Sequence, residues 1–82
     1  MNRDHVLFHL REAREALDHC IRDIEQDLDY DYGEFVVDVT HQYHHLNTAW
    51  NGRDASAEQV AACSEEDFQL WRRFPDTIDM SA

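Results

Sequence analysis

Four polar side chains in the middle of the chain have the types and the spacing for metal or proton chemistry. Glu34, Asp38, His41 and His45 follow one another at intervals of four, three and four residues. In an α-helix this spacing places them within roughly 40° of one line. Carboxylates and imidazoles on one side of a helix can ligate a metal ion or transfer protons. Asp38, His41 and His45 are therefore candidate ligands for a divalent transition metal.

The same row is also typical of a solvated helix face with hydrogen-bonded histidines, which needs no cofactor. The sequence lacks the HExxH motif of zinc proteases and the repeated ExxH motif of di-iron bundles. A neighbouring carboxylate favours the charged imidazole. We therefore expect His41 and His45, beside Asp38, to titrate somewhat above about 6.5.

A second acidic segment, from Asp27 to Gly33, invites comparison with a calcium loop between two helices. An EF-hand loop needs Gly at its sixth position and Glu at its twelfth. Counted from Asp27, these positions hold Tyr32 and Asp38. The register fails by one residue, and Asp31 is better explained as the N-cap of the next helix.

Glu12, Glu15, Glu34 and Asp38 resemble in type the carboxylate pairs of the all-α nucleotide pyrophosphohydrolases, ExxE followed by ExxD. Here the second pair is separated by four residues, and the chain has no lysine to bind phosphate. A nucleotide hydrolase is therefore only a remote alternative. We assign no catalytic residue.

Apolar side chains at intervals of three and four predict two long helices that would position these groups. The first, over about 4–28, has a stripe of Val6, Leu10, Ala13, Leu17, Ile21, Ile24 and Leu28. The second, over about 32–51, has a stripe of Val36, Val39, Tyr43, Leu46 and Trp50. We expect these two stripes to be buried against each other.

Capping residues set the bounds of the predicted elements. Asp31 begins the second helix after a short turn, so the two long helices should be antiparallel neighbours. The pair Asn51-Gly52 ends the second helix. Ser56 and Ser64 can each begin a helix within a segment of about 56–74. One kinked helix and two separate helices both fit this segment, and a tail of 75–82 follows.

The predicted architecture is a single all-α domain over 1–82, an antiparallel helical hairpin with a C-terminal helical segment. Eighty-two residues form only a marginal core. We therefore expect a homodimer with a four-helix core. Tyr43, Trp50 and Trp71 are the candidate contacts with a second subunit or a partner, since aromatic residues are favoured at interfaces. Cys20 and Cys63 are expected to be buried, reduced thiols.

Composition narrows the function classes. The chain has 18 acidic residues against seven arginines, a net charge of −11. Direct nucleic-acid binding needs a basic face and is not expected. No apolar stretch suits a membrane span or a signal peptide, so a cytoplasmic protein is expected. The leading hypothesis is a non-enzymatic protein that self-associates and binds a basic protein, in a narrower version as a nucleic-acid mimic. The alternative is a metal-binding helical protein.

Overall fold

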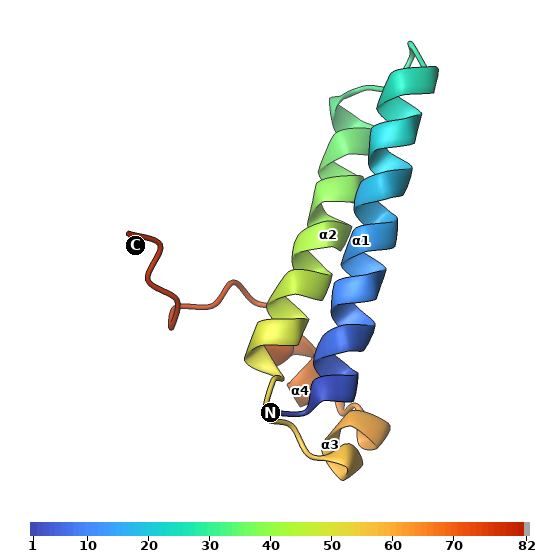
Figure 1. Ribbon diagram of the computed structural model, residues 1–82. Coiled ribbons are helices and arrows are strands. Elements are labelled where there is room, and N and C mark those ends of the chain that lie inside the picture. Colours follow the sequence, from blue (N-terminus) through green and yellow to red (C-terminus); the bar gives the residue numbers. More distant parts are fainter. Residues whose placement is uncertain (82) are drawn as a thin grey trace.

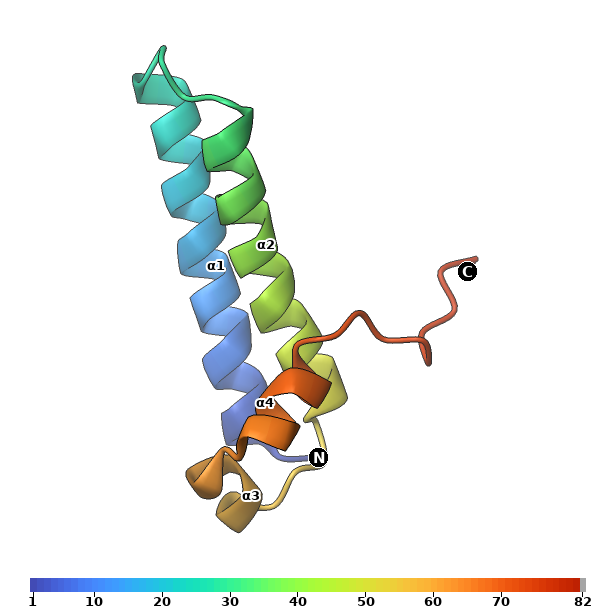
Figure 2. The same ribbon diagram turned by 180° about the vertical axis from the view of Figure 1, so that it is seen from behind.

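The computed structural model describes residues 1–81, all of whose regular elements are helices (Figure 1). Two long helices, α1 (Arg3–Gln26) and α2 (Tyr32–Asn51), lie side by side and antiparallel. Two short helices, α3 (Ala57–Ala62) and α4 (Glu65–Trp71), gather at the end of the hairpin where the N-terminus lies (Figure 2). The segment expected over 56–74 is thus two helices. Within residues 1–81, no helix is long and apolar enough to cross a bilayer.

Side-chain caps begin all four helices. The Asp31 carboxylate accepts a bond from the Glu34 backbone N–H at 2.9 Å, and Ser64 accepts one from Asp67. Ser56 and Gln59 exchange both bonds of a capping box. Gly52 is the C-cap of α2. These ends agree with the predicted ones because capping depends on local sequence alone.

Small residues and imidazoles form the interface between the two long helices. Ala13 and Cys20 of α1 and His45 and Ala49 of α2 are buried. Short side chains allow two helix backbones to approach closely, whereas leucine or isoleucine at the same positions would hold them apart. The two long helices therefore pack through the faces that carry these short side chains and imidazoles.

The expectation that the two apolar stripes are buried against each other within the chain is wrong. Leu10, Leu17, Ile21 and Ile24 of α1 each expose between 43% and 51% of their surface. On α2, Leu46 exposes 44% and Val36 61%. The helices meet instead through the neighbouring side of each cylinder, where the small residues lie.

Helix α4 covers the open end of the hairpin. Trp71 is buried there, with its ring centroid 5.4 Å from that of His5. The Asn47 amide donates to the Arg72 carbonyl at 3.0 Å, and the Asn51 amide donates to the Trp71 carbonyl at 2.9 Å. These bonds satisfy carbonyls at the C-terminus of α4 that the helix itself leaves unpaired.

Candidate functional site

Five histidines form a continuous cluster of rings at the open end of the hairpin. Ring centroids are 4.8 Å apart for His5 and His9, 5.2 Å for His9 and His45, 4.6 Å for His41 and His45, and 5.0 Å for His44 and His45. We call these five residues the histidine cluster. Both long helices contribute to it. His41 and His45 come from the predicted row on α2, His44 lies off that row, and His5 and His9 come from α1.

The central pair of the cluster shares one hydrogen bond. His9 Nδ1 and His45 Nδ1 lie 2.9 Å apart, so one of them must carry the proton and the other must accept it. Burial, together with the nearby imidazoles of His5, His45 and His44, lowers the pKa of His9 to about 4. Because a second proton would leave two donors facing each other, the pair is stable only while at least one ring is neutral.

Burial also lowers the pKa values of His44 and His45. The nearby charges of Arg72 and His41 also lower the pKa of His44. At His45, the rings of His41 and His44 lower the pKa and Glu12 opposes them. The expectation that His45 titrates above the ordinary value is therefore wrong. Desolvation and neighbouring imidazoles outweigh the nearby carboxylate.

Asp38 is occupied by a different partner. The Tyr30 hydroxyl donates to Asp38 Oδ2 at 2.6 Å, and the Cys20 sulfur lies 3.5 Å from the same hydroxyl oxygen. Partial burial and the bond to Asp38 raise the pKa of Tyr30. These contacts connect the turn between the long helices to both of them, so Asp38 has a structural role in closing the hairpin.

The predicted metal ligands are not brought together as a metal centre. Across residues 1–81, no group of three or more His, Cys, Asp or Glu side chains has an arrangement that could hold a metal ion. Of the three candidates, Asp38 bonds to Tyr30, His45 faces His9, and His41 is exposed. The remaining histidine, His19, lies on the surface of α1, with its Nε2 atom 3.3 Å from Asp23 Oδ2.

The sequence reasoning missed His5 and His9 as partners of the α2 histidines. A signal for them exists, because His5, His9, Ala13, Ala16 and Cys20 recur at intervals of four, four, three and four. This is a helical face without large apolar side chains, adjacent to the apolar stripe. Small residues at helical spacing favour close helix packing, which an apolar count does not detect.

The two exposed apolar stripes lie on the same broad face of the hairpin. At 100° per residue, the stripe on α1 is rotated by roughly 80° from the side that contacts α2, and the stripe on α2 by roughly 120° in the same sense. Because the helices are antiparallel, rotations in the same sense bring both stripes to one face. We call this the apolar face. It consists of Leu10, Leu17, Ile21, Ile24, Val36, Val39, Tyr43 and Leu46.

Helix α4 leaves the apolar face open. Its Phe68 contacts His44, with ring centroids 5.5 Å apart. His44 and Leu46 lie on opposite sides of α2, roughly 160° apart. The C-terminal helices therefore cover the other side of the hairpin. Beyond α4, Phe74 lies at the edge of the apolar face, where its ring is 5.1 Å from that of Tyr43.

An acidic face lies on the opposite side of the hairpin from the apolar face. A groove between α1 and α2 is lined there by carboxylates, two histidines and one arginine. Its carboxylates are Glu12, Glu15, Asp18 and Asp38. The hairpin thus has one uncharged apolar face and one predominantly acidic face, with the histidine cluster between them.

The three aromatic contact candidates lie in different environments. Trp71 belongs to the small core, while Tyr43 is exposed on the apolar face. Trp50 is half-buried, stacks under the Arg53 guanidinium at 4.0 Å and donates through Nε1 to Thr77 at 2.9 Å. Cys20 is buried as expected, whereas Cys63 is exposed because it lies in the turn between α3 and α4.

Comparison with known proteins adds no relative. No protein-family model, curated protein or solved structure matches the chain.

Proposed function

We propose that the protein is a non-enzymatic, self-associating module. Two copies pack their apolar faces together into a four-helix core, and the acidic faces, which remain outside, bind a basic protein surface. The observation that carries this proposal is the uncovered apolar face. The buried apolar residues among those described are few and mostly small, namely Ala13, Cys20, Ala49 and Trp71.

The size of the apolar face fits a second copy of the chain. Its exposed side-chain surface is on the order of 600 Å² per copy, close to the roughly 800 Å² that each partner buries in a stable interface. Twofold pairing of identical surfaces is the commonest oligomer symmetry. Two hairpins that pack face to face form a four-helix layer arrangement, in which leucines and isoleucines from all four helices become buried.

Charge opposes the association and gives it a distinctive salt dependence. Each copy carries −11, so the two copies repel each other at long range. Added salt screens this repulsion and should strengthen the dimer. Sedimentation equilibrium measured from roughly 50 to 300 mM salt tests the proposal. A dimer that tightens with salt supports it, and a folded monomer at every concentration refutes it.

The basic partner follows from the acidic face and the net charge. Attraction between an acidic and a basic surface weakens as salt rises, which is the opposite of the trend for self-association. Carboxylates along a groove can also occupy a phosphate-binding groove of a partner, which is the narrower role of a nucleic-acid mimic. Affinity capture at low salt followed by elution at high salt tests this half of the proposal independently of the dimer.

A metal-binding protein is the second candidate, and the facing Nδ1 atoms of His9 and His45 favour it. Two neutral imidazoles on neighbouring helices can both ligate one transition metal ion through Nδ1, once the proton between them has moved to Nε2 of its own ring. A third protein ligand would come from a rearranged His41 or from a second copy. Metal analysis of protein purified without a histidine tag tests this candidate. One bound metal per chain or per dimer would favour it.

A further inference from the structure

The two halves of the hairpin differ strongly in charge. The half next to the turn, residues 16–40, contains eight carboxylates and one arginine. The half at the open end, residues 1–15 and 41–54, contains four carboxylates and four arginines. Most of the carboxylates next to the turn are exposed, including Glu25, Asp27, Asp29, Asp31 and Glu34. One half is therefore strongly acidic and the other is close to neutral.

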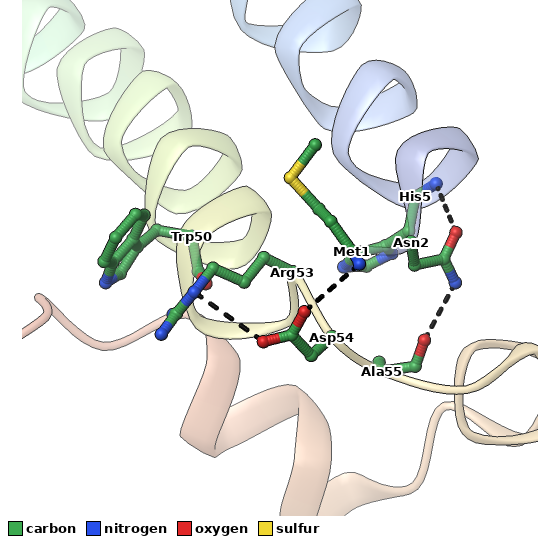
Figure 3. A network of polar contacts seen from close by, with 7 residues as sticks. All are labelled: Met1, Asn2, His5, Trp50, Arg53, Asp54 and Ala55. Atoms are coloured by element: carbon green, nitrogen blue, oxygen red, sulfur yellow. Dashed lines mark hydrogen bonds and ion pairs between the residues drawn. The ribbon is translucent and has the colours of Figure 1, made fainter.

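The charges where the open end meets the following loop are paired within the chain. The Met1 amino group lies 3.5 Å from Asp54 Oδ1, and Arg53 Nε lies 3.9 Å from Asp54 Oδ2 (Figure 3). The Arg53 guanidinium also lies 4.0 Å from the centre of the Trp50 ring. The Asn2 backbone N–H donates to the Arg53 carbonyl at 2.6 Å, which holds this loop against the start of α1. This end of the hairpin thus presents little uncompensated charge to a second copy.

The charges outside the hairpin leave this contrast intact. Helices α3 and α4 carry four carboxylates, but they cover the side of the hairpin away from the apolar face. In the segment that follows α4, Arg72 and Arg73 balance Asp76 and Asp79. The charges that border the apolar face are therefore mainly those of the two long helices.

The acidic half concentrates charges that repel one another. The pKa of Glu34 is raised by desolvation and by four nearby carboxylates, those of Asp31, Asp27, Asp23 and Asp38. Like charges that face each other across an interface strongly disfavour association. The acidic halves of two copies should therefore avoid each other.

Twofold symmetry allows two arrangements of the apolar faces. An axis that joins two copies of one face lies in the plane of that face, and it runs either along the hairpin or across it. An axis along the hairpin brings the two turns together, with α1 of each copy over α2 of the other. An axis across the hairpin brings each turn to the open end of the other copy. Each long helix then packs antiparallel on its own counterpart.

We propose that the axis runs across the hairpin, so that the acidic half of each copy packs beside the neutral half of the other. This inference rests on the dimer proposed above and adds its geometry. The apolar face is centred near Leu17 on α1, so Leu17 meets its counterpart and Leu10 lies opposite Ile24 of the second copy. Both arrangements bury the same leucines and isoleucines, so charge decides between them.

The apolar side chains at the edge of the face favour the same arrangement. Phe74, which is 71% exposed, lies beside Tyr43, and Val36, which is 61% exposed, lies nearer the turn. When α2 packs antiparallel on α2, Phe74 of each copy comes level with Val36 of the other, and both become covered. With the axis along the hairpin, Phe74 would instead come level with Arg11 and Arg14 of the second copy.

Spin labels at two positions, with distances between copies measured by double electron–electron resonance, test the arrangement. Both variants also carry Cys63→Ser, since Cys63 is exposed and Cys20 is buried. Leu28→Cys places a label in the turn, at a side chain that is 99% exposed, without changing any charge. We expect about 35 Å or more between the turn labels, because each lies roughly 11 residues of helix from the centre of the face. A distance below about 25 Å, as two packed helix layers would give, would overturn the proposal.

His19→Cys is the matched control and reports the dimer itself. His19 lies near the middle of α1 on its exposed surface, so both arrangements place its labels within roughly 30 Å of each other. A short distance at position 19 with a long one at position 28 supports the proposal. No distance between copies at either position would refute the dimer, and with it the proposed function. The Cys63→Ser protein alone shows whether Cys20 takes up label.

The unlabelled protein gives a second measurement that needs no substitution. Isotope-filtered nuclear Overhauser spectroscopy should show contacts between the methyl groups of Leu10 and Ile24 from different copies. Contacts between Leu10 and Leu46 from different copies, in place of these, would overturn the arrangement and leave the dimer standing.

Discussion

The Nδ1 atoms of His9 and His45 lie 2.9 Å apart across the interface of the two long helices. Where most helical hairpins place leucine against leucine, this one places imidazole against imidazole, with small residues on either side. The consequence is twofold. The interface is narrow, and a proton on each of the two rings would leave two donors facing each other. The large apolar side chains lie on a neighbouring face that residues 1–81 leave exposed.

Acid should destabilise the fold through His9. Its folded pKa of about 4 lies below the unfolded value of about 6.5, so the unfolded chain binds the proton first as the pH falls. The contribution of neutral His9 to the free energy of unfolding is complete above about pH 6.5 and is lost as the pH falls towards 4. Because the ring is only partly buried, we expect a loss of about 1 kcal/mol between pH 6.5 and 5.

Urea denaturation at these two pH values, at constant ionic strength, measures this loss. His9→Gln should reduce it, since His5, His44 and His45 then no longer surround a titrating ring at position 9. His19→Gln is the matched control, because His19 lies outside the cluster beside Asp23. If both variants retain the same pH dependence as the parent, the histidine cluster is not its source.

The bond between Tyr30 and Asp38 should contribute to stability. Tyr30→Phe removes the hydroxyl that donates to Asp38 at 2.6 Å. A hydrogen bond to a charged acceptor contributes roughly 1.5–3 kcal/mol, and partial exposure reduces this, so we expect a loss of about 1 kcal/mol. Tyr32→Phe changes a nearby tyrosine that is 87% exposed and should have no effect. If Tyr30→Phe and Tyr32→Phe have the same melting temperature, the structural role of Asp38 is contradicted.

The Asp31 cap should be structural rather than part of a calcium site. Asp31→Ala removes the acceptor of the Glu34 backbone N–H and should destabilise the protein by about 1 kcal/mol. Asp29→Ala, in the same turn, leaves the cap intact and should be nearly neutral. Millimolar calcium should leave the melting temperature of the parent unchanged. A rise of several degrees would show that the acidic turn binds the ion.

Helix ends were predictable from the sequence, and the packing faces were not. Asp31, Ser56, Ser64 and Gly52 act within a few residues of themselves, so local chemistry determines where helices begin and end. The faces depend on what is available to pack against. His45 is 8% exposed and the adjacent Leu46 is 44% exposed, the reverse of their hydrophobicity.

Only the α2 half of the histidine cluster was predictable, because spacing along one helix is local whereas the packing of two helices is not. Helical spacing placed His41 and His45 together, but the partners on α1 depend on how the two helices are rotated. That rotation follows from the small residues Ala13, Ala16 and Cys20, which permit close approach without being strongly hydrophobic. Periodicity identified the side chains that need burial, and left open whether this chain or another one buries them.

A charge on the apolar face should dissociate the proposed dimer. Leu46→Asp places a carboxylate in the proposed four-helix core, and we expect the dimer to weaken by more than about tenfold. Leu70→Asp is the matched control, because Leu70 is exposed on α4, away from that face. Size-exclusion chromatography with light scattering gives the masses. Dissociation by both variants alike would point to net charge rather than to the apolar face.

Isotope-filtered nuclear Overhauser spectroscopy on a mixture of labelled and unlabelled protein tests self-association through the apolar face most directly. It detects only contacts between copies. The account predicts intermolecular signals from the methyl groups of Leu17 and Ile21 to Tyr43, Leu46 or the same methyl groups of the partner. Intermolecular signals that arise only from the acidic face, or a folded protein with none at all, would contradict it.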